Sequence, residues 1–504
     1  MTTGSANFVS HLIGKHYIVV GGGFGGMAAA LRLRARGLEV TLVERLSCLG
    51  GRAQVFSRNG FTHDAGPTVI TAPFLFDELF QLFGKDRAKY CEFVPLDVWY
   101  DFHFDDGKKF SYTGDLEHSF REIAKFEPED VEGYQELLKV SESIFNIGFE
   151  QLSDQPFTNF AKMTQQIPSL IRLKSYLTVY QLISKYIKNE NLRKVFSIHP
   201  LLVGGNPYST TSIYSLIHFL ERKWGVFFAK GGTGALVRAI EKLMIEEGIK
   251  IEKGFDVSSI SINSKTSTVR SVQSLDGRSY SCDGLVFNGD PPFAYQNLLP
   301  KNLKRQRIRR PDSITKYSMG LFVLFFGTKC RYESVSHHTI WLGSRHKELL
   351  RDIFDNRCLA EDFSLYIHRP TATDTTFAPE GCDSFYVLCP VPNLQLRVPW
   401  DTEGERLRDR IVAALGSTLL PGLHDEITED FWMTPEDFLK DYKSVWGAGF
   451  SIAPILSQSA YFRYHNRDPD ISNLFFSGAG THPGAGVPGV LSSAKVVEKL
   501  VIEN

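Results

Sequence analysis

The sequence lacks the features that mark several classes of protein. Its 504 residues include only seven cysteines, which are scattered and form no C-x-x-C pair, so neither a disulfide framework nor a zinc site is predicted. Acidic and basic residues nearly balance at a formal net charge of −1, which gives no general attraction to nucleic acid. No apolar run reaches the roughly 18 residues of a membrane-spanning helix. We therefore expect reduced thiols and a cytoplasmic protein that neither binds nucleic acid nor crosses a membrane.

The first residues also lack a targeting signal. MTTGSANFVSHLIGKHY has no basic region followed by a continuous apolar run, as a secretory signal would have. Residues 1–14 are therefore predicted to be a disordered leader. Because the chain is too long for one compact core, two or three structural units are expected.

What the sequence does contain is a glycine-rich loop between two apolar runs. YIVVGGGFGGMAAALRLRARGLEVTLVER predicts a strand, a tight turn, a helix and a second strand. Gly21 permits the turn, Gly23 lets a pyrophosphate approach the backbone, and Gly26 lets helix and strand pack closely. Glu44 ends the second strand, where it can accept hydrogen bonds from a ribose. The pattern predicts a dinucleotide-binding site.

A second glycine pair distinguishes between dinucleotides. Gly50, Gly51 and Arg52 follow Glu44 closely, which resembles the fingerprint of FAD enzymes of the amine-oxidase and glutathione-reductase type. In those enzymes the pair continues along the pyrophosphate, and the arginine is available as a counter-charge. The alternative is a surface turn with a solvated arginine. FAD is the expected cofactor.

Near the C-terminus, FFSGAGTHPGAGVPGVLSSAKVVEKL predicts another strand, glycine-rich turn and helix. Between the two glycine loops, GLVFNGDPP predicts a buried strand that ends at Asp290 and returns the chain to the first loop's sheet. No cluster of metal ligands, Ser-His-Asp arrangement or Cys-His pair stands out in the sequence.

One segment has a strong charge bias. Residues 155–189 contain no acidic residue but five basic ones, and apolar residues recur there at helical spacing. The basic residues are Lys162, Arg172, Lys174, Lys185 and Lys188, and the apolar face comprises Leu173, Tyr176, Leu177, Tyr180, Ile183 and Ile187. Such a helix can lie in the membrane interface, or it can be a packing helix with a solvated basic face. The sequence does not decide between the two.

Several long stretches together resemble the bacterial-type phytoene desaturases of carotenoid biosynthesis. They are the glycine loop, GGRAQVFSRNGFTHDAGPTVIT, LLVGGNPYSTTSIYSLIHFLERKWGVFFAKGGTGAL, CLAEDFSLYIH and AYFRYHNRDPDISNLFFSGAGTHPGAGVPGV. The resemblance runs from about residue 15 to the C-terminus. It implies an FAD-dependent oxidoreductase that acts on CH–CH groups, commonly desaturating phytoene in four rounds to all-trans lycopene. Quinone or oxygen would take up the electrons.

The resemblance also implies an architecture. The expected fold is an α/β, amine-oxidase-like flavoprotein in which discontinuous segments form a Rossmann-type FAD-binding domain. Those segments are 15–73, 224–303 and 455–504, with a strand-rich, mixed α+β substrate domain at 304–454 and a helical, membrane-associating region at 74–223. The enzyme would be a peripheral membrane protein that takes its substrate from lipid.

Further cofactor contacts follow from the family. The second glycine turn would aim a helix N-terminus at the flavin, with Gly478 beside the pyrophosphate or ribityl and the backbone of Val487, Pro488, Gly489 and Val490 near the pyrimidine edge. Val257 would meet the adenine, unless it lies at an ordinary sheet edge. Related flavoproteins often carry an acid just inside this turn, where Ala479 stands here.

The sequence places no general base. Asp64, His199 and His482 lie in the shared stretches, and each is equally well explained as a residue that fixes a turn or a cap. The resemblance also leaves room for a desaturase that acts on another carotenoid or stops at neurosporene, a carotenoid ketolase, an amine oxidase, and a non-catalytic prenyl-binding escort protein. The intact glycine loops and Glu44 argue against the last.

Overall fold

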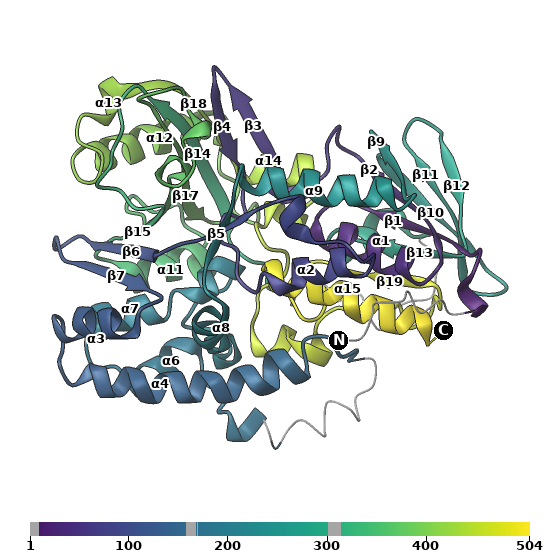
Figure 1. Cartoon of the computed structure of the whole chain (residues 1–504), viewed down its shortest axis with the longest axis horizontal. Helices are drawn as coiled ribbons and strands as arrows, with labels where there is room; N and C mark the ends of the chain where they lie inside the picture. The colour runs from purple at the N-terminus through teal and green to yellow at the C-terminus, as the bar shows by residue number, and fades with distance from the viewer. Residues whose placement is uncertain (1–9, 158–167, 169, 301–313, 504) are drawn as a thin grey trace.

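The computed structural model describes residues 10–157, 168, 170–300 and 314–503. A five-stranded parallel sheet forms one layer of the molecule, on the right in Figure 1. The strand order is β19-β13-β1-β2-β9. The strands are β1 (His16–Val20), β2 (Glu39–Glu44), β9 (Lys250–Lys253), β13 (Gly284–Phe287) and β19 (Leu474–Phe476). Because β13 pairs with both β1 and β19, its carboxyl end lies between the ends of those two strands.

Helices cover this sheet. They are α1 (Phe24–Ala35), α2 (Phe74–Gln81), α9 (Gly232–Glu246), α15 (Val487–Ile502) and the single turn α10 (Pro291–Phe293). Helices α1 and α15 pack against each other, and an ion pair from Arg32 to Glu498 joins them at 3.1 Å. Arg32 also pairs with Glu78 of α2 at 2.9 Å, so one buried guanidinium connects three helices.

A seven-stranded sheet forms the second layer, on the left in Figure 1. Its order is β18-β14-β17-β16-β15-β6-β7, and only the β15–β6 pair is parallel. The strands are β6 (Val98–Phe104), β7 (Lys109–Thr113), β14 (Gly320–Thr328), β15 (His338–Leu342), β16 (Leu365–His368), β17 (Asp383–Val391) and β18 (Ile427–Met433). All nine residues of β14 are buried, since both faces of the sheet are covered there. The accompanying helices are α11 (His346–Arg351), α12 (Trp400–Gly416), α13 (Leu423–Glu426) and α14 (Pro435–Tyr442).

A helical group closes the lower side of the molecule (Figure 1). It consists of α3 (Leu116–Ala124), α4 (Asp130–Phe145), α6 (Val179–Ile183), α7 (Glu190–Phe196) and α8 (Leu216–Trp224). The remaining small sheets are β3 (Val55–Arg58) with β4 (Phe61–Asp64), β5 (Phe93–Pro95) with β8 (Phe227–Ala229), and β10 (Val257–Asn263) with β11 (Thr268–Ser274) and β12 (Ser279–Ser281). Helix α8 packs along α4.

Three details differ from the sequence-based expectation. The segment 74–223 is not only helical, since its strands β6 and β7 complete the seven-stranded sheet. The strand expected to reach Asp290 ends at Phe287, and Asp290 precedes α10. Within the expected leader, Leu12 is buried in the core, and residues 1–9 lie outside the described residues. The domain boundaries stay a prediction.

For residues 155–189, the structure supports the packing alternative at three of the six apolar positions and contradicts the membrane alternative there. Among the described residues of this stretch, Val179–Ile183 is an α-helix, and Leu173, Ile183 and Ile187 are buried in the protein core. Their helical spacing reflects packing against α4 and its neighbours, so they cannot enter a membrane. Tyr176 does face outward with 62% of its surface exposed. Lys162 lies outside the described residues.

In the described part of the chain, no helix combines the length and the apolar character that a bilayer span requires. All seven cysteines are free thiols.

Candidate active site

One large cavity lies between the two main sheets and the helical group. Its volume is about 560 Å³, and it extends from the carboxyl ends of β1, β2 and β13 to α8 and the seven-stranded sheet. Most of the predicted cofactor residues line it: Gly21, Gly23, Glu44, Gly50, Gly51, Arg52, Val257, Asp290, Gly478, Val487, Pro488, Gly489 and Val490. Gly26 lies outside the lining. The fold therefore brings residues more than 450 positions apart in the chain to one space.

The three glycines of the first loop have different structural roles. Gly21 has a φ of +98°, a conformation that favours glycine. A Cβ at Gly26 would lie 2.0 Å from the carbonyl oxygen of Gly21, so Gly26 permits the contact between α1 and the loop. Gly23 has an ordinary backbone and borders the cavity, where a Cβ would approach only Asn288 Nδ2, at 3.1 Å, and the more distant Gly50 carbonyl.

Glu44 is buried at the end of β2 and lies under this loop. Its carboxylate accepts hydrogen bonds from the backbone N–H of Gly22 at 2.7 Å and of Leu46 at 2.8 Å. Burial raises the pKa of Glu44 above its ordinary value, and these two hydrogen bonds act against that rise. Glu44 thus fixes the loop and also borders the cavity.

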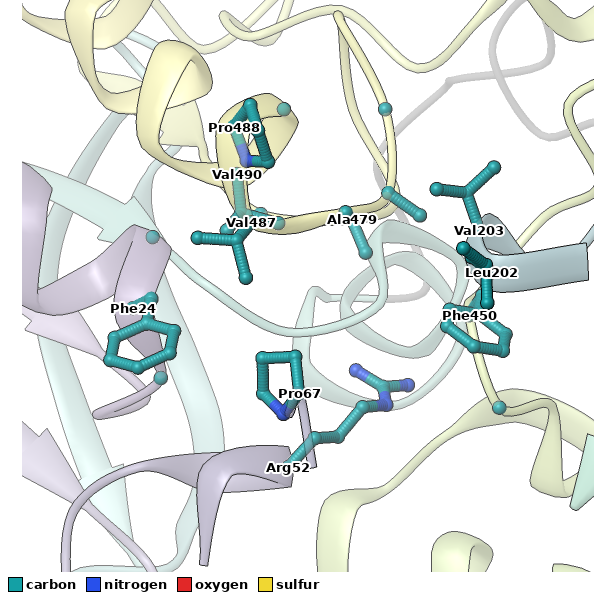
Figure 2. A pocket seen from close by; sticks show the side chains of 18 of the residues that line it. Phe24, Arg52, Pro67, Leu202, Val203, Phe450, Ala479, Val487, Pro488 and Val490 are labelled. Carbon is teal, nitrogen blue, oxygen red and sulfur yellow. The ribbon is translucent and has the colours of Figure 1, made fainter. Parts of the chain in front are cut away.

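The second glycine pair lies directly against the first loop. The N–H of Gly50 donates to the Gly22 carbonyl at 2.8 Å, and Gly50 and Gly51 both have positive φ. The Arg52 side chain extends into the cavity, where its Nη2 donates to Ser444 Oγ at 2.5 Å (Figure 2). Its Nε is buried and has no hydrogen-bond partner, so the guanidinium retains capacity for an anion.

The C-terminal turn forms the opposite wall. Figure 2 shows Val487, Pro488 and Val490 at the start of α15, across the cavity from Arg52 and Pro67. No acidic side chain lies in the first turn of α15, and no side chain caps it, so its backbone N–H groups are available to a ligand. A Cβ at Gly489 would lie 2.5 Å from the Gly484 carbonyl oxygen, so the turn requires glycine there.

Sequence reasoning missed Asn288, which connects the two glycine turns. It follows β13, so its side chain reaches Gly21 on one side, donating to the carbonyl at 3.3 Å, and Gly478 on the other. A Cβ built at Gly478 would lie 2.7 Å from Asn288 Oδ1. Asp290 accepts a hydrogen bond from Val445 N–H at 3.0 Å, and thus orders the segment that holds Ser444. The usable signal was a polar residue directly after a buried central strand.

These residues fit a flavin dinucleotide. Glycines keep the space at both turns free of side chains, two helices start there without side-chain caps, and Arg52 supplies an unpaired buried donor. Backbone N–H groups and the Arg52 guanidinium all donate hydrogen bonds, so they suit an extended anionic ligand that places one part at each glycine turn.

The three candidate bases have different surroundings. Asp64 lies outside the cavity lining and accepts hydrogen bonds from Thr233 and Gly234 at the start of α9, so it caps that helix. Burial raises the pKa of Asp64 to about 7. His482 borders the cavity, its Nε2 lies 3.0 Å from the Leu152 carbonyl, and burial lowers its pKa to about 4. His199 lies behind the wall, with Nε2 3.0 Å from Glu221 Oε2.

The part of the cavity beside α8 and the seven-stranded sheet is mainly apolar. Its walls include Ile144, Ile198, Leu220, Ile340 and Leu342. Among the polar groups that interrupt them are Glu221 of α8 and Tyr100 of β6, which share a hydrogen bond of 2.8 Å. Sequence reasoning did not single out Glu221, since its partners lie on separate elements.

Three buried histidines, His337, His338 and His368, lie behind this wall, and their ring nitrogens are within 4.8 Å of one another. No sequence motif pointed to this cluster. Burial lowers the pKa of all three, so the rings are neutral. The planes of the His338 and His368 rings are 24° apart, so their nitrogen lone pairs lie in nearly parallel planes. The ligands of a metal ion instead point at one common atom, so this arrangement does not favour a metal site.

Comparison with known proteins agrees with this geometry. The family model described as flavin containing amine oxidoreductase matches residues 24–497. The cyclohexylamine oxidase of Brevibacterium oxydans shares the fold, with a TM-score of 0.60 at 17% identity and coverage of 97% of this chain and 99% of that one. The chain belongs to the flavin-containing amine oxidoreductase family.

Relatives of higher sequence identity define the place of this chain within the family more narrowly. A lycopene-forming phytoene desaturase from Pantoea ananas is 43% identical over 491 residues, covering 97% of this chain and 99% of the relative. A neurosporene-forming phytoene desaturase from Rhodobacter capsulatus is 39% identical, with 96% and 93% coverage. Within the larger family, this chain is a member of the bacterial phytoene desaturases and an oxidoreductase.

Proposed function

We propose that this chain uses FAD to desaturate phytoene stepwise to lycopene. The observation that carries the proposal is the single cavity, which joins a glycine-lined, donor-rich end to a long apolar part. A hydrocarbon substrate needs apolar walls, and a dinucleotide needs uncapped N–H groups and glycines. Both requirements meet in one continuous cavity, so the substrate would lie against the reactive end of the cofactor.

The chain's own residues would hold FAD at both ends. The loop from Gly21 to Gly26 and Arg52 would bind the pyrophosphate, Glu44 the ribose, and Val257 the adenine. The turn before α15 would donate backbone N–H groups to the flavin end. When bound, FAD would accept a hydride from one carbon of each CH–CH pair. The apolar walls would exclude water and align the polyene.

The product spectrum tests this function. Purified protein is incubated with FAD and with liposomes that contain phytoene, and the extracted products are separated and identified by absorption. We expect successive products with longer conjugated systems that end at lycopene. Accumulation at neurosporene would correct the number of steps, and the absence of any desaturated product, with flavin bound, would refute the function.

We further propose that the enzyme is a peripheral membrane protein. Phytoene has forty carbons, and at roughly 0.8 kcal/mol per CH₂ its transfer into water would cost tens of kcal/mol, so its route must be through lipid. Leu170 and Leu173 border the cavity, while Ile171 between them is 61% exposed. Cavity wall and protein surface are thus one residue apart in this segment. Arg172 and Lys185 are exposed close by and would meet anionic head groups.

A further inference from the structure

The carboxylate of Glu221 is unusually placed for a residue in an apolar chamber. The residue lies on α8, retains 1% of its surface, and borders the cavity beside Leu220 and Ile217. In the part of the chain that the structure describes, no lysine or arginine forms an ion pair with it. Burying a carboxylate costs several kcal/mol, because the charge leaves water, and the groups around it must compensate for that cost.

Two side chains hold this carboxylate in place. The Tyr100 hydroxyl donates to Oε1 at 2.8 Å, and His199 Nε2 lies 3.0 Å from Oε2. Burial raises the pKa of Tyr100 well above its ordinary value, so the phenol remains a donor. The ring of His218 stands edge-on to His199 at 4.3 Å, and its Nε2 lies 2.7 Å from the Phe196 carbonyl oxygen. The Glu221 carboxylate is therefore oriented by Tyr100 and His199, and His199 in turn packs against His218.

The adjacent residue, Arg222, carries a positive charge but forms its hydrogen bonds with groups other than Glu221. Arg222 donates to the Thr113 carbonyl and to the hydroxyls of Ser119 and Tyr134. Glu221 consequently has no lysine or arginine partner among the described residues, and a hydrocarbon in the cavity offers it no hydrogen bond. What distinguishes Glu221 from a structural buried glutamate is that it borders the cavity, where it can accept a proton that the reaction releases.

We infer that Glu221 is the catalytic residue that accepts the proton in each desaturation, with Tyr100 and His199 as positioning residues. The inference rests on the proposed function. With FAD bound, one carbon of the saturated pair would lose a hydride to it. The neighbouring carbon would lose a proton, which forms an O–H bond on Glu221, and the electron pair of the broken C–H bond would become the new C=C bond. A quinone or oxygen would then take up the two electrons together with two protons, one of them from Glu221, which is thereby restored for the next round.

The Glu221→Gln variant tests the inference, because it keeps the size of the side chain and removes the basic oxygen. Loss of a general base lowers rates by typically 10²- to 10⁴-fold. We expect flavin reduction by phytoene, measured by anaerobic rapid mixing, to slow at least about 100-fold. Flavin content, melting temperature and phytoene binding should remain those of the wild type.

Isotope substitution separates chemistry from packing. Phytoene deuterated at the carbon that loses the proton should give a larger isotope effect in the variant, whereas deuterium at the hydride position should not. A merely structural role would leave the isotope effects unchanged. An E221Q enzyme that reduces flavin within threefold of the wild-type rate, with unchanged isotope effects, would overturn the inference.

The structure supplies a matched control. Glu429 is another buried glutamate bonded to a histidine, with Oε1 2.7 Å from His63 Nε2, but neither residue borders the cavity. Glu429→Gln should leave the rate within about twofold. If E221Q does not fold, Glu221→Asp keeps the charge and withdraws the carboxylate, and the same slowing and isotope effect are expected. A wild-type enzyme that desaturates nothing would instead refute the proposed function.

Discussion

At the scale of single residues, Gly23 and Gly26 stand three positions apart yet have different surroundings. A side chain at Gly23 would point mainly into the cavity, with the nearest atom of the protein at 3.1 Å, and its backbone φ of −72° suits any residue. A side chain at Gly26 would collide with the Gly21 carbonyl oxygen. The first glycine therefore preserves ligand space, and the second preserves the fold.

We predict that Gly23→Val yields a folded protein whose flavin content falls below about a tenth of the wild-type value, because each 1.4 kcal/mol of lost binding is tenfold in affinity. Gly26→Val should lower the free energy of unfolding by roughly 3 kcal/mol or prevent folding. Flavin absorbance and thermal unfolding measure both. Full flavin content in folded G23V would refute the assignment of this loop.

His482 gives the cavity wall a pH dependence. Burial lowers its pKa from 6.5 to about 4 in the folded protein, so the unfolded chain binds a proton first as the pH falls. Stability contributed by the neutral ring is present above pH 6.5 and is lost as the pH falls toward 4. Between pH 7 and 5 the loss amounts to about 2 kcal/mol.

Replacing His482 with glutamine, whose amide can still donate to Leu152, should reduce that pH dependence. Urea unfolding of both proteins at pH 7 and pH 5 measures it. Parallel losses in the two proteins would show that His482 does not titrate in this way. The other buried histidines remain in both proteins and cancel in the comparison.

At the scale of elements, the packing of α1 on α15 depends on one buried carboxylate. Glu498 pairs with Arg32 at 3.1 Å and with Arg36 at 2.7 Å, and its side chain is 7% exposed. Glu498→Ala should cost about 3 kcal/mol of stability, since it leaves a buried guanidinium less compensated. Because α15 follows the turn that we propose contacts the flavin, flavin should also dissociate more readily.

The control for this variant is Glu136→Ala on α4, where the glutamate pairs with Lys139 in an exposed position. Its loss should change stability by less than about 1 kcal/mol. Chemical denaturation and flavin release on dilution provide the measurements. If the two substitutions lowered stability equally, the buried ion pairs of Glu498 would contribute no more than the exposed Glu136–Lys139 pair.

Local patterns in the sequence predicted these elements well. The loop after β1 and the turn before α15 follow from glycines whose neighbours are apolar runs, which is information within about thirty residues. We expected the strand to continue to Asp290, but it ends three residues earlier, at Phe287. The chain has already left the strand before Pro291 and Pro292 begin α10. Helical spacing around Ile183 indicated an apolar face correctly but could not tell core from membrane.

At the scale of the whole molecule, the missed residues are those whose partners come from other elements. Glu221 contacts a strand more than a hundred residues earlier, and Asn288 lies between two distant glycine turns. Nothing in the immediate sequence of Glu221 distinguishes it from a solvated polar residue, whereas Asn288 directly follows the buried strand β13. Only the strand order of the parallel sheet brings Asn288 between β1 and β19.

Membrane association belongs to this scale too. The Ile171→Ser, Tyr176→Ser double variant should float less with anionic liposomes, because it removes exposed apolar contacts near the cavity wall. Arg172→Glu with Lys185→Glu should weaken flotation further and reduce its salt dependence. Ile245→Ser on α9, equally exposed at 60%, is the control. Flotation unchanged in all variants would place the membrane contact elsewhere.

The strand order has a consequence for biosynthesis. Strand β19 and helix α15 follow the other described elements in the chain, yet they complete the sheet beside β13 and cover α1, which are synthesised much earlier. Until β19 and α15 have been synthesised, the early glycine loop has no opposing wall. The two glycine turns therefore cannot form one site while the chain is growing through β13, and the proposed dinucleotide site can be completed only at the end of this order of synthesis.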